Sequence, residues 1–158
     1  MPPLLVPVPV KNHLVMFLEK EFGDCYEPKK KDPLIMLIMS YLEKQTKKSN
    51  IKPPSGHAIF YVKIPISYFN RYKLSKISED GVEELGEWFD KYFTRLMVEF
   101  VTSRLVLKDK KELIDLLAKN EKKSLIQINA SIRDFLNKYD IRDEDMPFDT
   151  VKKRFQRA

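Results

Sequence analysis

The stretch that most constrains this fold runs from residue 78 to about residue 107, where apolar side chains recur every three or four positions. They are Val82, Leu85, Phe89, Tyr92, Phe93, Leu96, Met97, Phe100, Val101 and Leu105. This period predicts one helix with a broad buried face. Ser78 is its predicted N-cap, and the acidic residues that follow suit the positive end of the helix dipole. Such a helix would span roughly 40 Å, so the rest of the chain must pack against it.

Composition places the chain among small globular proteins. Its 158 residues, 43% of them hydrophobic, suffice for one domain with a substantial core. The net charge of +6 permits acidic partners such as nucleic acid. Cys25, the single cysteine, excludes an internal disulfide and fits a reducing compartment. The first ten residues lack the basic region of a signal peptide, and no apolar run reaches the length of a membrane span, so we expect a soluble, cytoplasmic protein.

The N-terminal part predicts one strand followed by one helix. Residues 4–10 should form an edge strand, because Pro7 and Pro9 exclude a helix and leave one side of the strand without N–H donors. Residues 12–22 show a short amphipathic pattern, and Gly23 provides a stop for that helix.

The next part predicts a second helix and a second strand. Asp32 is a suitable cap for a helix over residues 33–47, which has an almost continuous apolar start. Residues 58–66 are rich in β-branched and aromatic side chains and should form a strand. Pro65 indicates that this strand is an edge strand or ends there. Residues 67–73 are expected to make one helical turn.

Three helical segments follow the long helix, at residues 109–119, 124–139 and 147–157. The last two are joined by residues 140–146, in which Ile141 is expected to be buried. Two amphipathic helices in this order are typical of a helix-turn-helix, whose second helix can enter a DNA groove. The connection is longer than the three or four residues that are usual for this motif.

The last segment carries the candidate binding residues. Phe148, Val151 and Phe155 should hold it to the preceding helix. Lys152, Arg154 and Arg157 should then face mostly solvent. We expect four basic residues to contact DNA phosphates and Gln156 to contact a base. The four are Lys152, Lys153, Arg154 and Arg157. The alternative is a solvated basic face, since cations also suit the C-terminus of a helix.

Acidic residues limit this interpretation. Asp143, Glu144 and Asp145 lie in the connection before the last helix and would repel phosphate unless they turn away. They could instead bind a cation, but they lack the spacing of an EF-hand and are well placed to cap the helix that follows. We therefore predict no metal site there.

The sequence contains no group of residues that predicts catalysis. His13 and His57 stand apart, without the ligand spacing of a zinc site, and Cys25 has only Lys29–Lys31 as basic neighbours in sequence. The four glycines form no phosphate-binding loop. We therefore expect a protein that is not an enzyme and that needs no cofactor.

Two further features leave a protein partner, or a homo-oligomer, as an alternative. Trp88 lies beside the apolar stripe of the long helix, where it either widens the buried face or anchors a partner. Residues 34–39 are continuously apolar and could be exposed.

A second group of lysines could extend a phosphate-binding surface or could simply be solvated. These are Lys29, Lys30, Lys31, Lys44, Lys47 and Lys48.

Both ends of the chain carry a pattern of packing residues that has a family resemblance. At the C-terminal end it comprises Ile132, Phe135, Tyr139, Ile141, Glu144, Asp145, Phe148, Asp149 and Lys153. At the N-terminal end it comprises Val8-Pro9-Val10, Phe17-Leu18 and Phe22-Gly23, and the region of Phe89 and Phe93 also takes part. The chain resembles small uncharacterised proteins of phages and mobile elements of Bacteroidetes-type bacteria. The resemblance implies a DNA-associated role in a bacterial host cell and supplies no catalytic residues.

Together these observations predict a mostly helical α+β protein. A small sheet of edge-type strands should pack on a long central helix, with a C-terminal helix-turn-helix-like unit. We expect a single domain over residues 1–158, divided into a strand and helix core at 1–107 and a helical subdomain at 108–158. The predicted function is that of a non-enzymatic DNA-binding or regulatory accessory protein. The alternative is a structural or interaction protein, such as a phage assembly component, a virion cargo protein or a host-factor binder.

Overall fold

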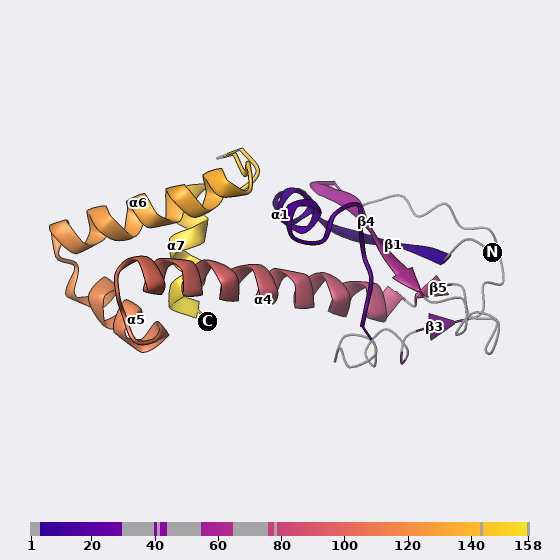
Figure 1. The fold of residues 1–158 in the computed structure, drawn as a ribbon, viewed down its shortest axis with the longest axis horizontal. Coiled ribbons are helices and arrows are strands. Elements are labelled where there is room, and N and C mark those ends of the chain that lie inside the picture. Colours follow the sequence, from indigo (N-terminus) through magenta and orange to yellow (C-terminus); the bar gives the residue numbers. More distant parts are fainter. Residues whose placement is uncertain are drawn as a thin grey trace. The chain divides into compact units, whose positions relative to one another are not determined.

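The computed structural model describes residues 4–29, 40, 42–43, 55–64, 76–77, 79–142 and 144–157 (Figure 1). As predicted, the protein is α+β and mostly helical. Its strands are β1 (Leu4–Lys11), β2 (Cys25–Tyr26), β3 (Leu42–Glu43), β4 (His57–Ile64) and β5 (Lys76–Ile77). Its helices are α1 (Asn12–Phe22), α4 (Glu79–Arg104), α5 (Lys110–Lys119), α6 (Lys122–Lys138) and α7 (Phe148–Arg157).

The chain forms two compact units, Met1–Phe89 and Asp90–Ala158, which are called the N-terminal unit and the C-terminal unit below. The division lies inside α4, whereas the sequence predicts a boundary after residue 107, close to the end of this helix. Each unit therefore contains part of one continuous helix.

The N-terminal unit contains a three-stranded sheet in the order β1-β4-β2. β1 is antiparallel to β4, with Val8 opposite Phe60, and β2 is parallel to β4. β1 is an edge strand, as predicted, and its two prolines occupy every second position. Because proline has no N–H, an edge is where a strand of this sequence can be accommodated.

The core of this unit follows the alternation of the strands. Alternate residues are buried from Val6 in β1 and from Phe60 in β4, namely Val6, Val8, Val10, Phe60, Val62 and Ile64. Leu14, Phe17 and Leu18 of α1 are also fully buried. The ring of Phe89 on α4 packs edge-on against Phe60 at 5.9 Å between centroids. The helix α1 has the predicted bounds and ends at Gly23, whose φ of +79° favours glycine.

One alternative for this unit is decided and one prediction needs correction. β4 lies between two strands and ends at Ile64, which agrees with the second of the two alternatives given for Pro65, the end of the strand. Leu42 belongs to β3, which pairs with β5, and not to the helix predicted over residues 33–47. A two-residue strand has no periodicity that sequence reasoning could detect. Most of residues 33–47 and all of residues 67–73 lie outside the described residues.

The long helix is confirmed, although it ends at Arg104 rather than at residue 107. Leu85, Phe89, Phe93, Met97 and Val101 are fully buried along its predicted stripe. Shortly after the helix ends, Val106 takes a positive φ of 55°, which redirects the chain toward α5. The proposed cap at Ser78 lies outside the described residues.

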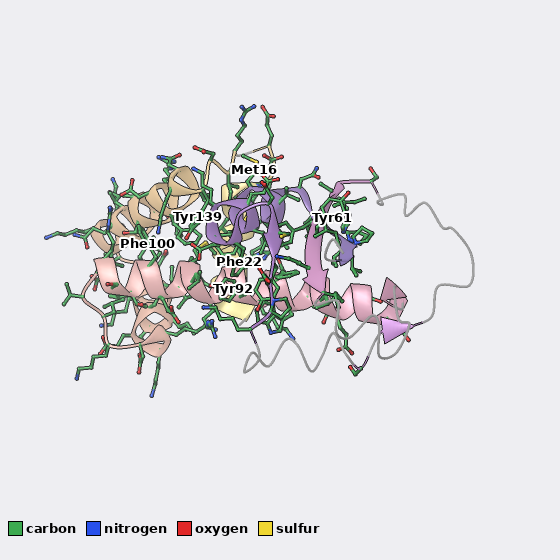
Figure 2. The ribbon with its side chains drawn as sticks, turned by 45° about the vertical axis from the view of Figure 1, so that its right-hand side comes forward. Met16, Phe22, Tyr61, Tyr92, Phe100 and Tyr139 are labelled. Carbon is green, nitrogen blue, oxygen red and sulfur yellow. The ribbon has the colours of Figure 1, made fainter. Side chains whose placement is uncertain are left out.

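In the C-terminal unit, Phe135 of α6 lies at the centre of an aromatic cluster. Its ring centroid is 5.6 Å from that of Phe93 and 5.5 Å from that of Phe100, both on α4, and 4.9 Å from Tyr139. Figure 2 labels Phe100 and Tyr139. Figure 1 shows α6 running alongside the C-terminal part of α4, consistent with these ring contacts. The cluster fixes α6 on α4.

None of the described helices is long and apolar enough to cross a membrane.

Candidate nucleic-acid interface

The connection between α6 and α7 is held by buried apolar residues. Ile141 is buried, as predicted, and Met146 is buried further along the connection. The backbone N–H of Ile141 donates to the carbonyl oxygen of Leu136 at 3.0 Å, and Asp140 takes a φ of 54° to allow this turn. The connection runs over residues 139–147, so it is even longer than predicted.

Val151 and Phe155 anchor α7, and both are fully buried, as their spacing predicts. Arg154 lies beside this buried pair and is not solvent-facing, which corrects one expectation. Its Nη1 donates to Oδ1 of Asp90 on α4 at 2.7 Å, and its side chain is 17% exposed. The physical reason is that Asp90 presents a half-buried carboxylate, which is stabilised by a charged hydrogen bond.

Lys153 is the one predicted binding residue that the structure describes as exposed. It forms no ion pair with any other described residue. The side chains of Lys152, Gln156 and Arg157 lie outside the described set, so their roles stay predictions. Glu144 and Asp145 are exposed just before α7, and Asp149 is exposed in its first turn. These carboxylates reduce the positive potential at this end of α7.

Further exposed lysines lie at both ends of α5 and at the start of α6. They are Lys108, Lys111, Lys119, Lys122 and Lys123. None of them forms an ion pair within the part of the chain that the structure describes. Sequence reasoning missed this group, although the lysine pairs at 110–111 and 122–123 were a visible signal.

Several carboxylates near these lysines already form hydrogen bonds or ion pairs with other groups. Oδ1 of Asp109 accepts a hydrogen bond from the backbone N–H of Glu112 at 3.1 Å and caps α5. Oε2 of Glu112 accepts one from the backbone N–H of Lys108 at 2.9 Å. Asp134 of α6 is paired with Arg104 at the end of α4. These acids serve helix capping and packing rather than neutralising the lysines.

The other candidates from the sequence form no convergent site. Cys25 is half-buried opposite Tyr61, and Nδ1 of His57 lies 3.2 Å from the carbonyl oxygen of Ser55. Among the described residues, no three His, Cys, Asp or Glu side chains are placed to hold a metal ion. Trp88 is half-buried, with its ring centroid 6.4 Å from that of Tyr26, so it widens the buried face of α4.

One exposed apolar feature lies in the C-terminal unit. Val106 is 90% exposed and Ile126 of α6 is 59% exposed. Val106 also lines an open hollow of about 370 Å³, together with Arg104, Leu105, Gln127, Ala130 and Ser131. The apolar patch expected at residues 34–39 lies outside the described residues.

The arrangement thus offers a cationic helical unit whose apolar side is packed and whose lysines are accessible. No protein-family model, curated protein or solved structure matches this chain.

Proposed function

We propose that this chain is a non-enzymatic DNA-binding accessory protein that binds through its C-terminal unit. This unit has sixteen basic and twelve acidic residues. The observation that carries the proposal is the group of exposed lysines on α5, α6 and α7 that have no ion-pair partner among the described residues. Ammonium groups left free in this way are suited to neutralising phosphates and releasing the counterions around DNA.

Within this proposal, the basic residues of α7 contact the phosphate backbone. Val151 and Phe155 are buried, so α7 is held firmly on one side while Lys153 remains accessible. Lys152 and Arg157 belong to the same short helix. Arg154 has a structural role through Asp90 and contributes less to binding. The resemblance to phage and mobile-element proteins is the basis for proposing an accessory role on such an element.

The test is a fluorescence-anisotropy titration of a labelled 24-base-pair duplex of mixed sequence at 50 and 200 mM salt. If about four phosphates are neutralised, the dissociation constant should rise roughly a hundredfold between these two concentrations. The variant Lys152→Ala/Lys153→Ala should weaken binding by about tenfold or more. Lys11 and Lys20 are exposed in the N-terminal unit and belong to neither group of candidate phosphate-binding lysines, so Lys11→Ala/Lys20→Ala removes the same charge as a matched control. Absence of binding at 50 mM salt would refute the proposal.

A second candidate, a structural or interaction protein, is favoured by the exposure of Val106 and Ile126. Apolar side chains so exposed commonly mark contacts with another protein. This candidate predicts self-association or partner binding that is lost in Val106→Asp and is insensitive to salt. Sedimentation velocity of the wild type and this variant tests it, and a strict monomer at all concentrations counts against self-association.

A further inference from the structure

α5 and α6 are joined by a much tighter connection than α6 and α7. Only Asn120 and Glu121 separate the two helices, and α5 and α6 pack against each other. Asn120 takes the left-handed conformation, with φ 53° and ψ 31°, and its N–H donates to the carbonyl oxygen of Leu117. Asparagine tolerates this conformation better than most residues other than glycine. A short turn between two helices is typical of a helix-turn-helix, and this connection is shorter than the three or four residues that are usual for the motif.

The two helices bury one side and leave the start of α6 open. Leu113 of α5 and Ile128 and Ile132 of α6 are fully buried. The opposite side of the first turns of α6 is exposed over five residues, which we call the α6 face. They are Lys122, Lys123, Ile126, Gln127 and Ala130.

The α6 face has the chemistry of a surface that reads DNA bases. It contains no carboxylate itself. The exposed N-cap residue Glu121 precedes it, and the next acid along α6, Asp134, is paired with Arg104. Lysine ammonium groups contact phosphates or guanine, and a glutamine amide can make two hydrogen bonds with adenine. The apolar side chains of Ile126 and Ala130 can contact the methyl group of thymine. The small Ala130 also lets the helix approach closely.

We infer that α5 and α6 form the helix-turn-helix of this protein and that α6 is the helix that enters the major groove of duplex DNA. This rests on the proposed function and assigns base reading to the α6 face, while α7 contacts phosphates. Charge complementarity selects the occupant, because Lys122 and Lys123 on the α6 face outnumber the exposed carboxylate beside them in sequence, that of Glu121, and suit a polyanion.

The experiment combines the anisotropy titration with selection from a pool of duplexes that carry a randomised 12-base-pair core. The wild type should enrich a defined core sequence. Gln127→Ala should lose the preference at one or two positions, while its affinity for an unselected duplex changes less than threefold. Lys122→Ala/Lys123→Ala should weaken binding at 100 mM salt by about tenfold or more and lower the salt slope by about two. Lys11→Ala/Lys20→Ala should behave as the wild type. Because all these side chains are exposed, the variants should keep the circular dichroism spectrum of the wild type.

The outcomes separate this inference from the proposed function. If the wild type binds no duplex at low salt, both the proposed DNA binding and the assignment of α6 are refuted. If binding depends on salt but the α6 variants bind as tightly as the control variant, only the assignment of α6 is refuted. Enrichment of no core sequence, or a preference for the single-stranded form of the same oligonucleotide, also overturns it. Loss of base preference in Gln127→Ala together with the lowered slope in the lysine variant supports it.

Discussion

The ion pair between Arg154 and Asp90 should contribute measurably to the stability of the C-terminal unit. The two atoms are 2.7 Å apart, and the side chains are 17% and 27% exposed. An exposed ion pair contributes about 0–1 kcal/mol, whereas removing one partner of a fully buried pair costs about 3–5 kcal/mol. Because this pair lies between these limits, we expect Arg154→Ala to lower the free energy of unfolding by about 2 kcal/mol.

A double-mutant cycle with Asp90→Ala isolates the pairwise contribution. Urea unfolding followed by far-ultraviolet circular dichroism should show a midpoint about 1 M lower for Arg154→Ala, given typical denaturant slopes. The cycle should give a coupling of about 1–2 kcal/mol. Arg95 and Glu99 provide a matched control, because their charged atoms are 3.8 Å apart and their side chains are 65% and 63% exposed. Their coupling should stay below about 0.5 kcal/mol.

The same variant separates a structural role from a phosphate contact. If Asp90 occupies the guanidinium, Arg154→Ala should leave the salt slope of duplex binding unchanged, whereas each lost phosphate contact lowers it by about one. A coupling no larger than that of the Arg95–Glu99 control would refute the structural assignment. A slope lowered by one would show that Arg154 contacts DNA.

Two further stability predictions concern the same unit. Phe135→Ala should lower the free energy of unfolding by about 3–5 kcal/mol in urea unfolding, because Phe135 is fully buried against three other rings; a loss below about 1 kcal/mol would contradict this. Val106→Gly should raise the melting temperature by a few degrees in a calorimetric scan, because a β-branched residue at a φ of 55° is strained and glycine is not; a lowered melting temperature would show that no strain is released.

The elements with regular local patterns could be predicted from the sequence. The apolar stripe of α4, the short pattern of α1 ending at Gly23 and the alternating valines of β1 each depend on neighbours within a few residues. Burial of Val151 and Phe155 followed from their spacing in the same way. Local periodicity is enough to specify these elements, because each must bury one face.

Features that depend on distant residues could not be predicted. Arg154 and Asp90 are 64 residues apart in the sequence, so their pairing follows only from the packing of α7 on α4. The two-residue strands β3 and β5 are strands only because they pair with each other, and neither is long enough to show a periodic pattern. The close connection of α5 to α6 had a local signal in Asn120, but the basic residues of α6 are spread over 17 residues, whereas α7 has the same net charge within 10.

The division of α4 between the two units has a consequence for how the chain folds. Eleven residues of this helix belong to the N-terminal unit and fifteen to the C-terminal unit. Fragments of this length are barely helical in water when nothing packs on them. Each part of α4 therefore stays helical only while the core of its own unit is folded. If one core unfolds, its part of α4 should unfold as far as the boundary between the units. Each core buries part of the same helix, so unfolding of either one exposes hydrophobic surface of α4.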